Sequence, residues 1–254
     1  IDIAGSIESI SKIDKDILYT AYNNFYDLSN MLLVIGGDFD KDKILEEIKK
    51  RITKTSNNMQ VERIYEKEQD EIVGKEKTVT MEVSMPIFAI GFKDKPSKDE
   101  EIVKKHIAIQ IILYMLLGKS SEGYQKLYNN GDIIAQPSLD YEFSKQYAHV
   151  LISGGAKEPK KIVEILKEQI EKYKKEGLNK EHFERIKKKI YGDFMSEYND
   201  VSSMARMFLA DYFKGINSFD YLEQYNSVSI EYAYSILQEV FDLNKMVISI
   251  VKGK

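Results

Sequence analysis

Two segments of this chain resemble each other, and their separation constrains what the chain can fold into. "IDKDILYTAYNNFYDLSNMLLVIGG", from Ile13, aligns without a gap with "VSIEYAYSILQEVFDLNKMVISIVKG", from Val228. Asp27 falls on Asp242 and Met31 falls on Met246, so the offset is a constant 215 residues. Each segment has the pattern of an amphipathic helix, then [Phe/Tyr]-Asp-Leu-x-x-Met, then an apolar run of strand length.

A repeat with this period has the size of a whole domain, so the chain would hold the end of one domain and a full copy of the next. We therefore predict a helix-strand-helix tail of a first, mostly absent domain at residues 1–56, a linker at 57–77 and a complete second domain at 78–254. The linker is predicted from a polar, charged stretch that shows no clear period. Chance similarity is the alternative, because helix-turn-strand units are common.

Hydrophobic periodicity predicts helices and strands on both sides of the linker. The predicted helices are Ser9–Tyr26, 44–53, Ser97–Leu117, 120–130, one starting at Pro159, Lys180–Tyr198, Ser203–Phe213 and Ile230–Phe241, and the predicted strands are Met31–Ile35, 78–92, Ile134–Phe143, Gln146–Ser153 and Met246–Val251. The strand at Met31–Ile35 is apolar without interruption, which is typical of a strand buried on both faces.

The turn after that strand, Gly36-Gly37-Asp38, is not a phosphate-binding loop. It lacks the spacing of both the dinucleotide fingerprint and the P-loop, and the carboxylates of Asp38, Asp40 and Asp42 would repel a phosphate. Asp40 instead has the position of a helix N-cap, which satisfies free N–H groups at a helix start.

Composition excludes several classes of function. The net charge of −4 disfavours nucleic-acid binding, which needs a surplus of Lys and Arg. The longest apolar run, Ile107–Leu117, is shorter than the roughly 20 residues of a membrane span. The chain has no cysteine, which is compatible with a reducing cytoplasm. It begins at Ile1 without a methionine, so we expect it to be part of a longer polypeptide whose targeting region is missing here.

Three stretches resemble the insulysin/pitrilysin family of zinc peptidases. Residues 1–40 are similar to the region that follows the catalytic residues in bacterial members, and "LLGKSSEGYQKLYNNGDI" and "GLNKEHFERIKKKIYGDF" are similar to parts of their second domain. The resemblance implies an α+β fold, with an antiparallel or mixed sheet packed by helices. It also implies that the parent protein is a zinc metallopeptidase.

In that family an inverted H-x-x-E-H helix holds the zinc, and its Glu acts as the general base on the bound water. The three histidines of this chain, His106, His149 and His182, are scattered and none lies in such a motif. We therefore predict no catalytic residue and no metal site in this chain, and expect the zinc in the upstream domain of the parent. His106 is predicted to be a satisfied core or boundary residue, His149 to lie on a strand, and His182 to be solvated.

Active relatives use an Arg and a Tyr of the second domain to hold the substrate. The corresponding stretch has no Arg between Lys119 and Lys145, so a direct electrostatic contribution is in doubt. Tyr124, Tyr128 and Tyr141 are the candidates for residues near the substrate, and core packing is the favoured alternative for all three.

The resemblance therefore predicts the non-catalytic C-terminal part of a zinc-dependent peptidase, inactive by itself, that forms one wall of a peptide-substrate chamber. The expected partners are the upstream catalytic domain of the same polypeptide, a peptide substrate, or a homologous subunit, without nucleic acid or membrane. The alternative is a catalytically inactive scaffold or partner subunit of the same fold. A third possibility, an unrelated α+β binding domain, requires the two similar segments to differ in structure.

Overall fold

The computed structural model describes residues 3–53, 61–62, 64–65, 69–98 and 101–254. The chain forms two compact units, unit 1 at Ile1–Glu66 and unit 2 at Lys67–Lys254. Several residues of the predicted linker, and two within the predicted helix Ser97–Leu117, lie outside the described residues.

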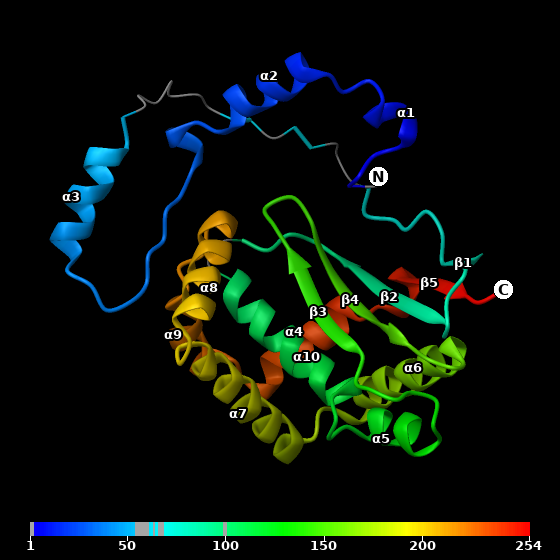
Figure 1. Cartoon of the computed structure of the whole chain (residues 1–254). Coiled ribbons are helices and arrows are strands. Elements are labelled where there is room, and N and C mark those ends of the chain that lie inside the picture. The colour runs from blue at the N-terminus through cyan, green and yellow to red at the C-terminus, as the bar shows by residue number, and fades with distance from the viewer. Residues whose placement is uncertain (1–2, 54–60, 63, 66–68, 99–100) are drawn as a thin grey trace. The chain divides into compact units, whose positions relative to one another are not determined.

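Unit 1 is helical in its described part (Figure 1). Its elements are α1 (Ile7–Ile10), α2 (Lys15–Phe25), the 3₁₀ turn η1 (Leu28–Asn30) and α3 (Lys41–Arg51). Side-chain caps set the helix starts: Asp14 accepts a hydrogen bond from the N–H of Ile17, and Asp40 accepts from the N–H groups of Asp42 and Lys43. The N-cap prediction for Asp40 is confirmed.

The prediction of a buried strand at Met31–Ile35 is wrong for this chain. No strand is assigned there, and the five side chains are 37–64% exposed. A strand is stable only when its N–H and C=O groups pair with a neighbour, and no strand is assigned in the described part of unit 1. The apolar run is present, but the described residues of unit 1 provide no strand that could pair with it.

Unit 2 is built on one five-stranded sheet with the strand order β1-β5-β2-β4-β3. The strands are β1 (Glu76–Thr80), β2 (Ile87–Asp94), β3 (Ser138–Phe143), β4 (Ala148–Gly155) and β5 (Met246–Lys252). β1 runs parallel to β5 and every other pair is antiparallel, so the sheet is mixed. The strand predicted at 78–92 is two strands, because the chain leaves the sheet before Pro86, which has no N–H for a ladder.

Helices of unit 2 pack against one face of this sheet (Figure 1). The helices are α4 (Ile102–Leu117), α5 (Glu122–Asn129), α6 (Pro159–Glu176), α7 (Lys180–Glu197), α8 (Val201–Lys214), α9 (Asp220–Ser227) and α10 (Ile230–Val240), with the 3₁₀ turn η2 at Leu243–Lys245. Of these, α4, α6 and α10 contact the sheet directly, while α7 and α9 pack on α4. Helix α9 was not predicted, because it is short and buries only Tyr225. The fold is mixed α and β, as predicted.

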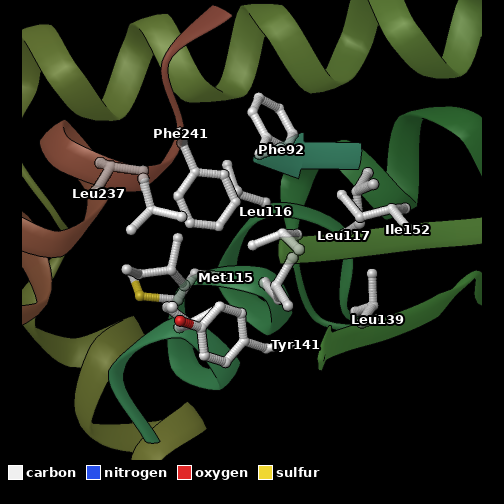
Figure 2. Packing of buried hydrophobic residues seen from close by; sticks show 14 of the residues in the cluster. Phe92, Met115, Leu116, Leu117, Leu139, Tyr141, Ile152, Leu237 and Phe241 are labelled. Atoms are coloured by element: carbon white, nitrogen blue, oxygen red, sulfur yellow. The ribbon is translucent and has the colours of Figure 1, made fainter. Parts of the chain in front are cut away.

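Helix α4 is the centre of the core. It is apolar on nearly all sides because the sheet and helices α6, α7, α9 and α10 surround it. Figure 2 shows Met115, Leu116 and Leu117 of α4 among side chains from the strands and from α10. The labelled neighbours are Phe92, Leu139, Tyr141, Ile152, Leu237 and Phe241.

The internal similarity has a structural counterpart. Helices α2 and α10 are both 11 residues long, and their first residues, Lys15 and Ile230, differ by the same offset of 215. After each helix, an Asp begins a three-residue 3₁₀ turn: Asp27 accepts from the N–H of Ser29, and Asp242 accepts from the N–H of Asn244, both at 2.9 Å. The two segments therefore share local structure as well as sequence.

Candidate functional site

The two faces of the sheet differ in chemistry and exposure. Side chains alternate along β2 and β4: Phe88, Ile90 and Phe92 are buried beneath the helices, whereas Ala89 and Gly91 between them are half-exposed. The same alternation places Val150 and Ile152 inside and His149, Leu151 and Ser153 outside. Unit 2 therefore has one sheet face covered by helices and one accessible face, which we call the open face.

Strand register arranges the open face in rows across the sheet. One row holds small side chains on four strands and a lysine on the edge strand β1, and the next two rows become progressively larger and more charged. The rows are Lys77, Ser249, Ala89, Ser153 and Ser138; then Val247, Gly91, Leu151 and Asp140; then Lys93, His149 and Glu142. Small side chains leave the backbone accessible over a shallow surface, so an extended peptide can lie close to it.

The helix-covered side of the sheet carries a buried ion pair at the end of β2. Lys105 of α4 contacts Asp94 at 2.9 Å, and the side chains of this pair are 8% and 4% exposed. Glu239 of α10 lies 3.1 Å from the same ammonium, and the Tyr141 hydroxyl donates to Asp94 at 2.7 Å. These contacts connect the end of β2 to two helices.

Tyr141 is a donor in this network. Its side chain is 4% exposed and faces the helices with Leu139 and Phe143, away from the open face. Burial, together with the nearby Asp94 carboxylate, raises the pKa of its phenol well above the usual range. Tyr141 therefore stays protonated, and its position is that of a packing residue.

The other two candidate tyrosines lie on α5, with stacked rings 5.6 Å apart. Tyr124 is 7% exposed and Tyr128 is 50% exposed. Ser121 begins this helix by accepting a hydrogen bond from the N–H of Tyr124. Tyr128 is therefore the candidate whose ring has substantial access to solvent, and a role near the substrate stays a prediction for all three.

A cleft of about 260 Å³ lies between α4, α7 and α9. Its lining includes four aromatic side chains, Tyr114, Phe194, Tyr221 and Tyr225, with two isoleucines, Gln110 and two acidic residues of α7. His106 contributes to the cleft, and its Nδ1 lies 2.7 Å from the Tyr221 hydroxyl. Sequence reasoning missed this cleft because most of its aromatic residues lie at ordinary core positions of separate helices.

The histidines occupy three different environments. His106 is a half-buried boundary residue with a hydrogen-bond partner, one of the two positions predicted, and burial, with the charge of Lys214 as a second cause, lowers its pKa to about 4. His149 lies on β4 at the open face. His182 was predicted to be solvated, but it is only 9% exposed, and burial lowers its pKa. His182 and Phe183 are both buried in the first turn of α7. The charged residues around them in the sequence did not indicate this burial.

Within the described residues, no group of three or more His, Asp or Glu side chains is placed to hold a metal ion. In the same part of the chain, no helix combines the length and the apolar character needed to cross a bilayer.

Residues 12–190 match the family model of the peptidase M16 inactive domain. The chain belongs to the M16 peptidase family. The match starts in unit 1, crosses the boundary between the units and ends in α7. The fold class predicted from the resemblance is therefore that of the family.

Named relatives agree with this assignment. The chain is 31% identical over 258 residues to the uncharacterized zinc protease YmfH of Bacillus subtilis, covering all of this chain and 60% of that protein. The structure of an M16-like peptidase from Alicyclobacillus acidocaldarius matches with a TM-score of 0.91 at 27% identity, over the whole chain and 62% of the relative. A protease from Helicobacter pylori shares the fold, with a TM-score of 0.83 at 19% identity over 98% of this chain and 61% of the relative. The chain thus spans about three fifths of these relatives.

The buried ion pair makes a testable contribution to stability. In Lys105→Met, the Asp94 carboxylate loses its buried counter-ion, which typically costs about 3 kcal/mol or more of unfolding free energy. Lys126→Met is the matched control, because Lys126 makes its ion pairs at the surface. Urea titrations measure the free energy of unfolding of both variants and of the unchanged chain. Equal stability of the two variants would contradict a structural role for the Lys105–Asp94 pair.

The lowered pKa of His106 predicts that the free energy of unfolding depends on pH. Because its folded pKa is about 4 and the ordinary value is 6.5, the unfolded chain binds more protons between these values. The contribution of His106 to the free energy of unfolding is therefore highest above pH 6.5, and it falls by about 3 kcal/mol as the pH drops to 4. We expect His106→Gln to flatten the dependence of unfolding free energy on pH relative to His149→Gln. Identical slopes in the two variants would refute this assignment.

Proposed function

We propose that this chain is the non-catalytic C-terminal portion of a zinc-dependent peptidase and that unit 2 forms one wall of the chamber that holds the peptide substrate. The open face is the observation that carries this proposal. It is a strand surface with a row of small side chains across four strands, and the helices lie on the other side. Membership of the M16 inactive-domain family supports a role that does not include the chemical step.

The chemistry would then come from a domain upstream in the same polypeptide. Relatives extend beyond the region that this chain matches, and one of them is named a zinc protease. In such a protein zinc would polarise the scissile carbonyl and activate a water molecule. The residues of unit 2 would position the peptide and exclude bulk water, which strengthens electrostatic interactions at the reacting bond.

The proposal also covers the candidate tyrosines and the compartment. Tyr124, Tyr128 and Tyr141 remain proposed near the substrate. Direct contact is expected only of the half-exposed Tyr128, while the other two would support the surrounding structure.

The absence of cysteine supports a cytoplasmic location. A homologous partner subunit could replace the upstream domain if the parent has lost its zinc site.

Zinc content distinguishes a peptidase from an inactive scaffold. We expect one zinc per chain in the full-length product of the same gene, and none in the 254-residue chain purified in parallel. We also expect hydrolysis of unfolded peptides by the full-length product only. Absence of zinc from both proteins, under conditions that load a known family member, would refute the peptidase and favour the scaffold.

A further inference from the structure

The cleft between α4, α7 and α9 is a cavity that the proposed function does not use. Helices line it, whereas the open face belongs to the strands, so the two are separate surfaces of unit 2. Its volume of about 260 Å³ lies just below the roughly 300 to 1,000 Å³ that is typical of pockets for drug-sized molecules. The cleft therefore has room for a small organic ligand, and its lining indicates the charge of that ligand.

Aromatic rings from all three helices line the cleft. Tyr114 lies on α4, Phe194 on α7, and Tyr221 and Tyr225 lie on α9. The ring centroids of Phe194 and Tyr221 are 5.4 Å apart, so these two rings connect α7 and α9. The face of an aromatic ring carries a negative partial charge and attracts cations. Such a lining favours a ligand that combines an apolar part with a positive charge.

One ammonium group of the chain itself already contacts this lining. The Nζ atom of Lys189 lies 3.8 Å from the centroid of the Tyr114 ring, and the same ammonium forms an ion pair with Asp193. Both Tyr114 and Asp193 line the cleft. A ring and a carboxylate of the cleft thus act together on an ammonium group in the molecule as it stands.

A second carboxylate of the cleft is open to another cation. Glu197 lies one turn after Asp193 on α7, and it has no ion-pair partner among the residues that the structure describes. Gln110 of α4 adds a side-chain carbonyl oxygen that can accept a hydrogen bond. His106 is uncharged near neutral pH, because burial lowers its pKa to about 4, so it does not repel a cation. The cleft therefore provides a charge and a hydrogen-bond acceptor for one more ammonium group.

We propose that this cleft binds a small protonated amine, with the ammonium group beside Glu197 and the ring of Phe194 and the apolar part of the ligand against Tyr221. Phe194 and Glu197 are three residues apart on α7, so their side chains lie on the same face of the helix. A primary ammonium suits the site better than a quaternary one, because it has N–H groups to donate to the oxygens of Glu197 and Gln110. The inference goes beyond the proposed function, since it involves neither the open face nor zinc.

Three probes of similar shape and different charge test this proposal. They are phenethylamine, which is a cation at neutral pH, phenethyl alcohol, which is neutral, and hydrocinnamate, which is an anion. In titrations of the full-length product of the gene followed by saturation-transfer NMR, we expect phenethylamine to bind at least about tenfold more tightly than phenethyl alcohol. Hydrocinnamate should bind more weakly still, because the carboxylates of the cleft repel it. Equal binding of the three probes would overturn the proposal.

A matched pair of variants locates the bound amine. Glu197→Gln removes the carboxylate of the cleft and keeps the shape of the side chain, and Glu184→Gln removes an exposed carboxylate of α7 that does not line the cleft. We expect Glu197→Gln to weaken the binding of phenethylamine at least about fivefold, and Glu184→Gln to change it by less than about twofold. Equal losses would indicate general attraction to an acidic surface and would contradict the proposal. Unchanged binding in Glu197→Gln would place the amine elsewhere and would overturn it.

The contribution of the ring is tested by a second pair. Phe194→Leu keeps an apolar side chain in the cleft but removes the aromatic face, and Phe219→Leu is the control, because Phe219 does not line the cleft. In Phe194→Leu the preference for phenethylamine over phenethyl alcohol should fall by about threefold or more, whereas Phe219→Leu should retain it. Urea titrations show whether both variants are still folded. An unchanged preference in a folded Phe194→Leu variant would contradict the position assigned to the ammonium group.

Discussion

The burial of α4 between the sheet and the surrounding helices is the interaction on which unit 2 depends. Because α4 is enclosed on nearly every side, the strands and the other helices are positioned by their contacts with it. Lys105 adds a polar link at the start of this helix, where it pairs with Asp94 at the end of β2. Because α4, α6 and α10 contact this side, the opposite face of the sheet in unit 2 stays accessible, and the proposed function relies on that asymmetry.

The two similar segments show that a sequence pattern and its environment contribute separately to structure. Both segments form a helix and an Asp-capped 3₁₀ turn, because these features depend on local hydrogen bonds. Only β5 is a strand, since strand pairing requires neighbours that unit 2 has and unit 1 lacks in its described residues. The same pattern thus gives a buried element in one case and an exposed apolar surface in the other.

Sequence reasoning succeeded where the determinants are local or strongly periodic. The cap at Asp40, the helix ending at Leu117 and the helix beginning at Pro159 all follow from side-chain chemistry within a few residues. It failed where burial is decided by distant segments. His182 is buried by its tertiary surroundings, and the aromatic cleft is assembled from three helices that the linear pattern does not bring together. The open face was also not foreseen, because it becomes visible only when the register of five strands is known.

The central claim is that the open face of the sheet contacts the peptide substrate, and site-specific photo-cross-linking tests it most directly. A photoreactive residue would replace Ser249, which is exposed on the open face, or Glu164, which is exposed on α6, in the full-length protein. The account predicts that an unfolded peptide is captured at position 249 and not at position 164. Capture at position 164 alone, or equal capture at both positions, would contradict it.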